Sequence, residues 1–341
     1  MNLDKKIAMP LWIMVIFLLF VVLYLWKSIF VMLTFTFILL IFFSGLYRYF
    51  FKISHSNIIS ASITGFIFVW FFGIIGFIVS TQIESFTENF DKIGKWFQGL
   101  ISSNSLLNVY FKDFNIQQIF SNVDFSALWT SALWIISWFA GWLVTVGLLL
   151  VFILIEKDTF VKKIDIIFSD KSEKKIENIY GKIYSDLNIF IVSKFLIALL
   201  NWVVSWIIML LFWLEFALLF ALFVFILDFI PSVWGAIAMT LPFLFSFVQF
   251  DQSYMSFVLL ACLMVPQFIT GNIIEPRVMG SRLNLSSFVI ILSLIFWSSL
   301  WWVSGAFLAI PLMVSINIVL SKFSITQPIA IFLSQDGQIK K

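Results

Sequence analysis

Long apolar runs separated by short polar stretches cover most of the sequence. Continuous runs lie at about residues 9–26, 29–47, 58–80, 128–155, 187–213 and 254–272. Each falls in or near the range of roughly 17 to 25 residues that an α-helix needs to cross a hydrocarbon core of about 30 Å. With two further, interrupted runs, the pattern predicts an all-α, polytopic helical membrane protein with about eight transmembrane segments.

Two interrupted runs, residues 215–249 and 286–320, differ from the others. Each is too long for one straight span and too short for two spans joined by a loop. The first breaks at Asp228-Phe-Ile-Pro231 and the second between Ser298 and Gly305. Paired, interrupted hydrophobic segments are typical of the substrate site of transporters, because broken helix ends offer backbone groups to a solute. The sequence leaves open whether each run crosses once or re-enters as a hairpin, which would put residues 275–282 outside or inside the cell, respectively.

The residue types at the two breaks suit a solute site near the middle of the bilayer. Proline frees a backbone carbonyl, glycine lets the backbone approach, serine offers a hydroxyl, and Asp228 is an acid able to carry a proton. We expect the two breaks to meet there, although both could be kinks whose serines bond to their own helices. The candidates are Asp228, Pro231, Ser232 and Gly235 at the first break, and Ser298, Ser304 and Gly305 at the second.

Further candidates lie in the fifth run and after the sixth. Lys194, Asn201 and Ser205 are spaced so that they share one helical face, which either lines a pathway or binds helices together. Pro276 is expected to end the preceding helix at Glu275, and Glu275 is expected to pair with Arg277 across it.

The distribution of basic residues predicts the orientation. Seven lysines lie between Lys157 and Lys182, and basic residues also flank the first two runs, so both termini are expected in the cytoplasm. The predicted parts are an N-terminal transmembrane hairpin (1–56) that turns at Lys27 and Ser28; third and fourth spans (57–156) with an extracytoplasmic extension (82–129); cytoplasmic amphipathic helices (157–186); a transport core (187–322); and a cytoplasmic tail (323–341).

Composition narrows the classes of function. The chain is 62% hydrophobic and 11% charged, whereas a soluble domain carries about a quarter charged residues. One histidine and one cysteine provide no catalytic triad, disulfide or metal cluster, and Asp228 has no second intramembrane aspartate for a protease dyad. A net charge of +3 gives no indication of nucleic-acid binding. We therefore predict a non-enzymatic membrane protein without metal or cofactor, whose partners are the lipid bilayer and a small solute, cation or proton.

Two motifs resemble those of a known family. The run G-N-x-x-E-P-R-V-M-G-x-R-L-N-L-S begins at Gly271, and D-F-I-P-S-V-W-G-A-I-A-M-T-L-P runs from Asp228 to Pro242. Both resemble the autoinducer-2 exporter family of permease-like membrane proteins. The chain departs from the family pattern at Trp234, where glycine is usual, and at Ser287, where proline is usual.

The resemblance implies a secondary transporter in a prokaryotic inner membrane that exports a small polar solute, with the quorum-sensing signal autoinducer-2 as the name-giving substrate. It also implies assembly of several identical subunits. Other members are described as sodium(lithium)/proton antiporters, for which Asp228 and Glu275 would be suitable acids. A third interpretation is a membrane scaffold in which Glu275 and Arg277 only close a loop.

Overall fold

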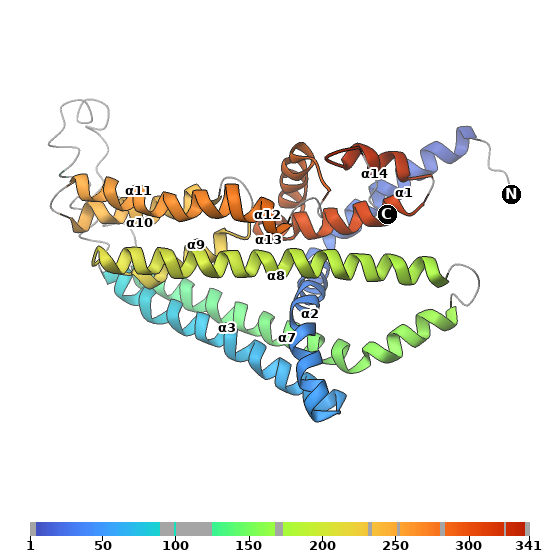
Figure 1. Ribbon diagram of the computed structural model, residues 1–341, viewed down its shortest axis with the longest axis horizontal. Helices are drawn as coiled ribbons and strands as arrows, with labels where there is room; N and C mark the ends of the chain where they lie inside the picture. Colours follow the sequence, from blue (N-terminus) through green and yellow to red (C-terminus); the bar gives the residue numbers. More distant parts are fainter. Residues whose placement is uncertain are drawn as a thin grey trace. The chain divides into compact units, whose positions relative to one another are not determined.

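The computed structural model describes residues 5–88, 99, 125–167, 173–230, 234–250, 253–279, 284–323 and 325–337. Regular structure in these residues is entirely helical (Figure 1). By length and composition six of the described helices could cross a membrane, counting Ser287–Ser321, which bends back on itself, as one helix. Two shorter apolar helices cover Ala217–Leu227 and Ile237–Gln249. The prediction of an all-α, polytopic membrane protein is confirmed.

The described part of the chain forms the following helical elements in order. They are α1 (Lys5–Leu25), α2 (Lys27–Ser54), α3 (Asn57–Glu88), α7 (Phe125–Ile167), α8 (Glu173–Leu211), α9 (Ala217–Leu227), α10 (Trp234–Gln249), α11 (Ser253–Ile269), the π-helical turn η1 (Thr270–Ile274), α12 (Glu275–Met279), α13 (Ser287–Ser321) and α14 (Gln327–Leu333).

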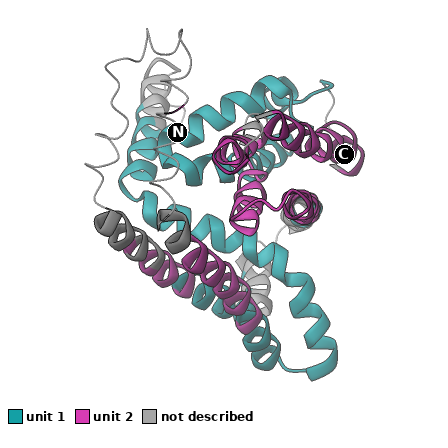
Figure 2. Ribbon diagram, turned by 90° about the vertical axis from the view of Figure 1, so that its left-hand side faces the viewer, with its two compact units in different colours: residues 1–65, 145–192, 281–341 teal, residues 66–144, 193–280 magenta. Residues whose placement is uncertain are grey.

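The chain forms two compact units, and each is described by itself (Figure 2). Unit 1 contains residues 1–65, 145–192 and 281–341, and unit 2 contains residues 66–144 and 193–280. Helices α3, α7 and α8 contribute residues to both units.

In unit 2 the first interrupted run forms a helical hairpin of α9 and α10. Its base is closed by Gln249, whose Nε2 donates to the Trp213 carbonyl at 2.6 Å and whose Oε1 accepts from the Glu215 N–H at 2.8 Å. Higher up, the rings of Phe216 and Phe245 lie 5.4 Å apart. The two helices therefore run antiparallel, and the predicted break at Asp228 lies at the tip.

An apolar core joins this hairpin to its neighbours in unit 2. Met209 of α8, Phe220 of α9, Phe245 of α10, and Leu259 and Leu263 of α11 are buried in one cluster. Burial of each large apolar side chain contributes about 1.5–3 kcal/mol, so the packing fixes the hairpin between α8 and α11. This packing holds the tip of the α9–α10 hairpin beside the polar residues of α8 and α11.

In unit 1 the second interrupted run, α13, also turns back on itself. Trp301 and Trp302 leave helical geometry, with φ of −127° and 56°, which confirms the predicted break between Ser298 and Gly305. The Ser293 hydroxyl donates to the Ala309 carbonyl at 3.1 Å, so the two arms run antiparallel. Gly305 is required where the arms meet, because a Cβ there would overlap the Trp297 carbonyl.

The arms of both hairpins are short for a membrane crossing. At about 1.5 Å per residue, α9 and α10 measure about 16 and 24 Å, and the arms of α13 about 21 and 28 Å. A hydrocarbon core is about 30 Å thick. Of the two alternatives left open by the sequence, the geometry therefore favours hairpins that re-enter.

The N-terminal helices differ from the predicted hairpin. Lys27 is already the first residue of α2, and the junction is the single residue Trp26. The Trp26 N–H donates to the Val22 carbonyl at the end of α1, and the Phe30 N–H donates to the Trp26 carbonyl at the start of α2, so no loop separates the two helices. The chain therefore bends at Trp26, and the predicted reversal at Lys27 and Ser28 is absent.

The remaining predicted parts lie partly outside the described residues. Residues 89–98 and 100–124, most of the predicted extracytoplasmic extension, are not described. Residues 157–167 continue α7 and residues 173–186 begin α8, so the predicted surface helices are extensions of spans. In the tail, α14 follows α13, and the Ser286 N–H donates to the Leu333 carbonyl at 3.0 Å.

Candidate transport site in unit 2

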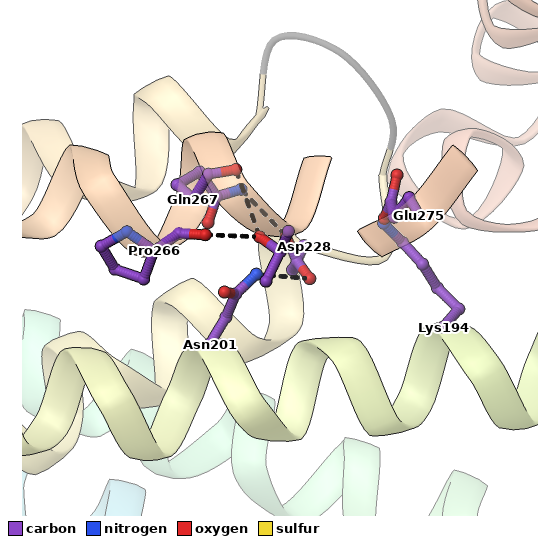
Figure 3. Close-up of polar contacts among 7 residues, drawn as sticks. Lys194, Asn201, Asp228, Pro266, Gln267 and Glu275 are labelled. Atoms are coloured by element: carbon purple, nitrogen blue, oxygen red, sulfur yellow. Dashed lines mark hydrogen bonds and ion pairs between the residues drawn. The ribbon is translucent and has the colours of Figure 1, made fainter. Parts of the chain in front are cut away.

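The tip of the α9–α10 hairpin carries a buried carboxylate held by two amides. Asp228 caps the C-terminal end of α9 and is 6% exposed. Asn201 Nδ2 of α8 donates to its Oδ2 at 3.2 Å, and Gln267 Nε2 of α11 donates to its Oδ1 at 3.0 Å (Figure 3). We call Asn201, Asp228 and Gln267 the Asp228 cluster.

The Asp228 cluster is incompletely satisfied. Within the described part of the chain no cation forms an ion pair with Asp228, and both of its partners are neutral. The Asn201 side chain is 1% exposed, and its Oδ1 is a buried acceptor without a hydrogen-bond partner. An unpaired buried acceptor costs about 1–3 kcal/mol, and a buried carboxylate costs more when no positive charge compensates it. The Asp228 carboxylate and Asn201 Oδ1 can therefore accept a proton, a cation or a donor group of a solute.

The polar stripe predicted on the fifth run is buried in the structure. Lys194, Asn201 and Ser205 on α8 are at most 5% exposed, whereas Leu196 and Leu200 between them are 56% and 45% exposed. One face of α8 therefore points into unit 2 and the other outward. Whether the stripe lines a pathway stays a prediction.

Glu275 forms an ion pair with Lys194 and not with Arg277, the partner predicted from the sequence. Lys194 Nζ on α8 donates to Glu275 Oε1, and the two side chains are 7% and 26% exposed (Figure 3). Arg277, the expected partner, is exposed. The ion pair joins helices distant in sequence because α11 runs antiparallel to α8, which brings residue 275 to the level of residue 194.

Pro276 does not end a helix, and this prediction is wrong. Glu275 has helical angles, φ −54° and ψ −51°, and α12 runs on from Glu275 to Met279. The preceding five residues form η1, in which the Glu275 N–H donates to the Thr270 carbonyl five residues back. This wide turn leaves room for the proline ring, and Pro276 lies in the first turn of α12, where no N–H is needed.

The other predicted residues are distributed over both units. Gly235 lies against the Gln267 side chain, where a Cβ would overlap Nε2. Pro231 and Ser232 lie outside the described residues. Ser298, Ser304 and Gly305 belong to the α13 hairpin of unit 1, so their meeting with the first break stays a prediction.

Sequence reasoning missed Gln267. It occupies the inward face of α11 that Leu259 and Leu263 define at intervals of four residues. A polar residue at the next position of this face was the available signal.

A multi-pass helical fold with an interrupted hairpin and a buried carboxylate at its tip is typical of membrane transporters. The family model for AI-2E family transporters matches residues 11–325. The chain therefore belongs to the AI-2E transporter family.

Individual relatives match over shorter stretches. The chain is 36% identical to the AI-2 transport protein TqsA of Escherichia coli over 110 residues, which cover 32% of each chain. It is 25% identical to a candidate transport protein of Borreliella burgdorferi over 197 residues, which cover 57% of this chain and 54% of the relative. The matches thus span about half or less of these relatives.

Proposed function

We propose that this protein is a secondary transporter that exports a small polar solute, and that the Asp228 cluster binds the solute. The observation that carries the proposal is the buried Asp228 carboxylate at a hairpin tip, next to the open acceptor of Asn201. A solute rich in hydroxyls would donate to both oxygens and so compensate the cost of burying them. TqsA is named for AI-2, which makes that quorum-sensing signal the first solute to test.

The topology that we propose follows from the short hairpin arms and the lysines. With residues 157–182 in the cytoplasm, α8 would run outward, and the α9–α10 hairpin would enter from the outside and return there. Helix α11 would then run inward, and the α13 hairpin would enter from the cytoplasm. The C-terminus would lie in the cytoplasm of a prokaryotic cell, and the exposed apolar faces of α2, α3 and α7 would contact lipid or identical subunits.

A cation/proton antiporter is the second candidate, and a specific observation favours it. Hard cations bind oxygen ligands, and the free carbonyls at the C-terminal end of a broken helix add to them. Asp228 ends α9, so its carboxylate, Asn201 Oδ1 and the last carbonyls of α9 belong to the same end of the helix.

Purified protein in sealed vesicles distinguishes the two functions. Vesicles containing a pH-sensitive dye should show no sodium-dependent proton movement if the protein is a solute exporter, but should move autoinducer-2 or a related polyol down its gradient. Sodium- or lithium-dependent proton movement without solute transport would replace the exporter with the antiporter. Empty vesicles provide the baseline, and neither activity in folded protein would contradict both.

A further inference from the structure

In unit 2, α8 faces the segment formed by α11, η1 and α12. The contacting side chains are spaced differently along the two segments. On α8, Lys194 and Asn201 are seven residues apart. On the opposite segment, Gln267 and Glu275 are eight residues apart. Gln267 nevertheless contacts Asp228 beside Asn201, while Glu275 contacts Lys194 (Figure 3).

A straight α-helix would not present both side chains on the same face. At about 100° per residue, seven residues complete two turns to within about 20°, whereas eight residues overshoot by about 80°. With Gln267 on Asp228, an uninterrupted helix would therefore present Ile274 to Lys194 and turn Glu275 aside. The π-helical turn η1 absorbs one residue between them, because its hydrogen bond reaches five residues back.

Two side chains of this wide turn donate to carbonyls of the preceding turn of α11. The Thr270 hydroxyl lies 2.9 Å from the Pro266 carbonyl and 3.2 Å from that of Gln267. Asn272 Nδ2 donates to the Phe268 carbonyl at 3.1 Å. The single Thr270 hydroxyl is thus shared between the carbonyls of residues 266 and 267, and the carbonyl of residue 268 has an amide donor.

Pro276 opposes the return to an α-helix. In the α-helical register residue 276 would donate its N–H to the Asn272 carbonyl, but proline has no N–H and its ring would strike that oxygen. Proline is strongly unfavourable in the interior of an α-helix, so substitution of this residue removes the main obstacle to straightening.

We infer that Pro276 and the turn η1 form a positioning device that sets the register between α8 and α11, so that the Asp228 cluster and the Lys194–Glu275 pair exist together. Pro276 and Thr270 are then positioning residues for the site. The inference about the register does not depend on the transported species; only its consequence for transport rests on the proposed function.

Cross-linking of paired cysteines tests the register. In a Cys262→Ala background, Lys194→Cys is combined with either Glu275→Cys or Ile274→Cys and treated with a short bis-methanethiosulfonate reagent. With Pro276 present, we expect the 194–275 yield to exceed the 194–274 yield severalfold. Pro276→Ala should reverse this preference. Deletion of Ile273 in the Pro276→Ala background removes the extra residue and should restore the 194–275 cross-link in a straight helix.

Other outcomes would overturn the inference. A 194–275 yield unchanged by Pro276→Ala would mean that Pro276 does not set the register. The same holds if the deletion of Ile273 fails to restore the 194–275 cross-link, or if Pro276→Ala fails to fold with and without the deletion. Either result would mean that η1 does more than absorb one residue. In chains with native Lys194 and Glu275, transport should fall in Pro276→Ala and recover with the deletion. A restored cross-link without restored transport would count against the proposed function and leave the register inference standing.

Discussion

Replacing Asp228 with asparagine should lower transport at least about tenfold, a factor equivalent to about 1.4 kcal/mol of activation free energy. The substitution keeps the shape of the side chain and removes its charge. Asn201 can rotate its amide so that Oδ1, now without a partner, accepts from the new amide. We therefore expect the fold to persist, with a change of about 1–2 kcal/mol in the free energy of unfolding.

Asp228→Leu separates the chemical role from the structural role. Leucine leaves the amides of Asn201 and Gln267 without their acceptor, and each unpaired buried group costs about 1–3 kcal/mol. This variant should lose both transport and thermal stability, measured by tryptophan fluorescence in detergent. Full transport by folded Asp228→Asn would contradict a role for the charge.

Replacing Glu275 with glutamine should destabilise the protein by about 3–5 kcal/mol, because it leaves a buried lysine without its counter-charge. Lys194→Met should lower the free energy of unfolding by less, since the Glu275 side chain that it leaves unpaired is 26% exposed and that of Lys194 only 7%. Arg277→Gln is the matched control, because Arg277 is exposed and only two residues from Glu275. It should change neither thermal unfolding nor transport.

The double variant Lys194→Met/Glu275→Leu shows whether the ion pair does more than hold helices together. Replacing a buried ion pair with apolar residues of similar size is often neutral or stabilising. We expect the double variant to recover the stability lost in Glu275→Gln but to transport poorly. Transport at the wild-type rate would reduce the pair to a structural contact.

How well each feature can be predicted depends on how far apart in the sequence the interacting residues lie. Local patterns, such as the breaks after Asp228 and between Ser298 and Gly305 or the buried stripe of α8, could be predicted, because helix periodicity and proline or glycine act within a few residues. The partner of Glu275 could not, because Lys194 is distant in sequence and is reached only through the antiparallel packing of α8 and α11.

The wrong prediction at Pro276 has a related cause. Proline usually ends an α-helix, but a π-helical turn before it removes both the missing hydrogen bond and the steric clash. Such a turn has no simple periodic signal. The bend at Trp26 was missed because Lys27 and Ser28 are polar residues that also fit the first turn of a helix.

Labelling of a cysteine beside the Asp228 cluster tests most directly whether this face of α8 lines an aqueous pathway. Ser205 is 2% exposed and lies one helical turn from Asn201, so Ser205→Cys in a Cys262→Ala background leaves the cluster intact. In vesicles that transport, it should react with a charged, water-soluble methanethiosulfonate, and the transported solute or cation should protect it. Leu200→Cys, on the outward face of the same helix, should stay unlabelled in lipid. An unreactive Ser205→Cys in a transporting protein would mean that the stripe is dry and that the pathway runs elsewhere.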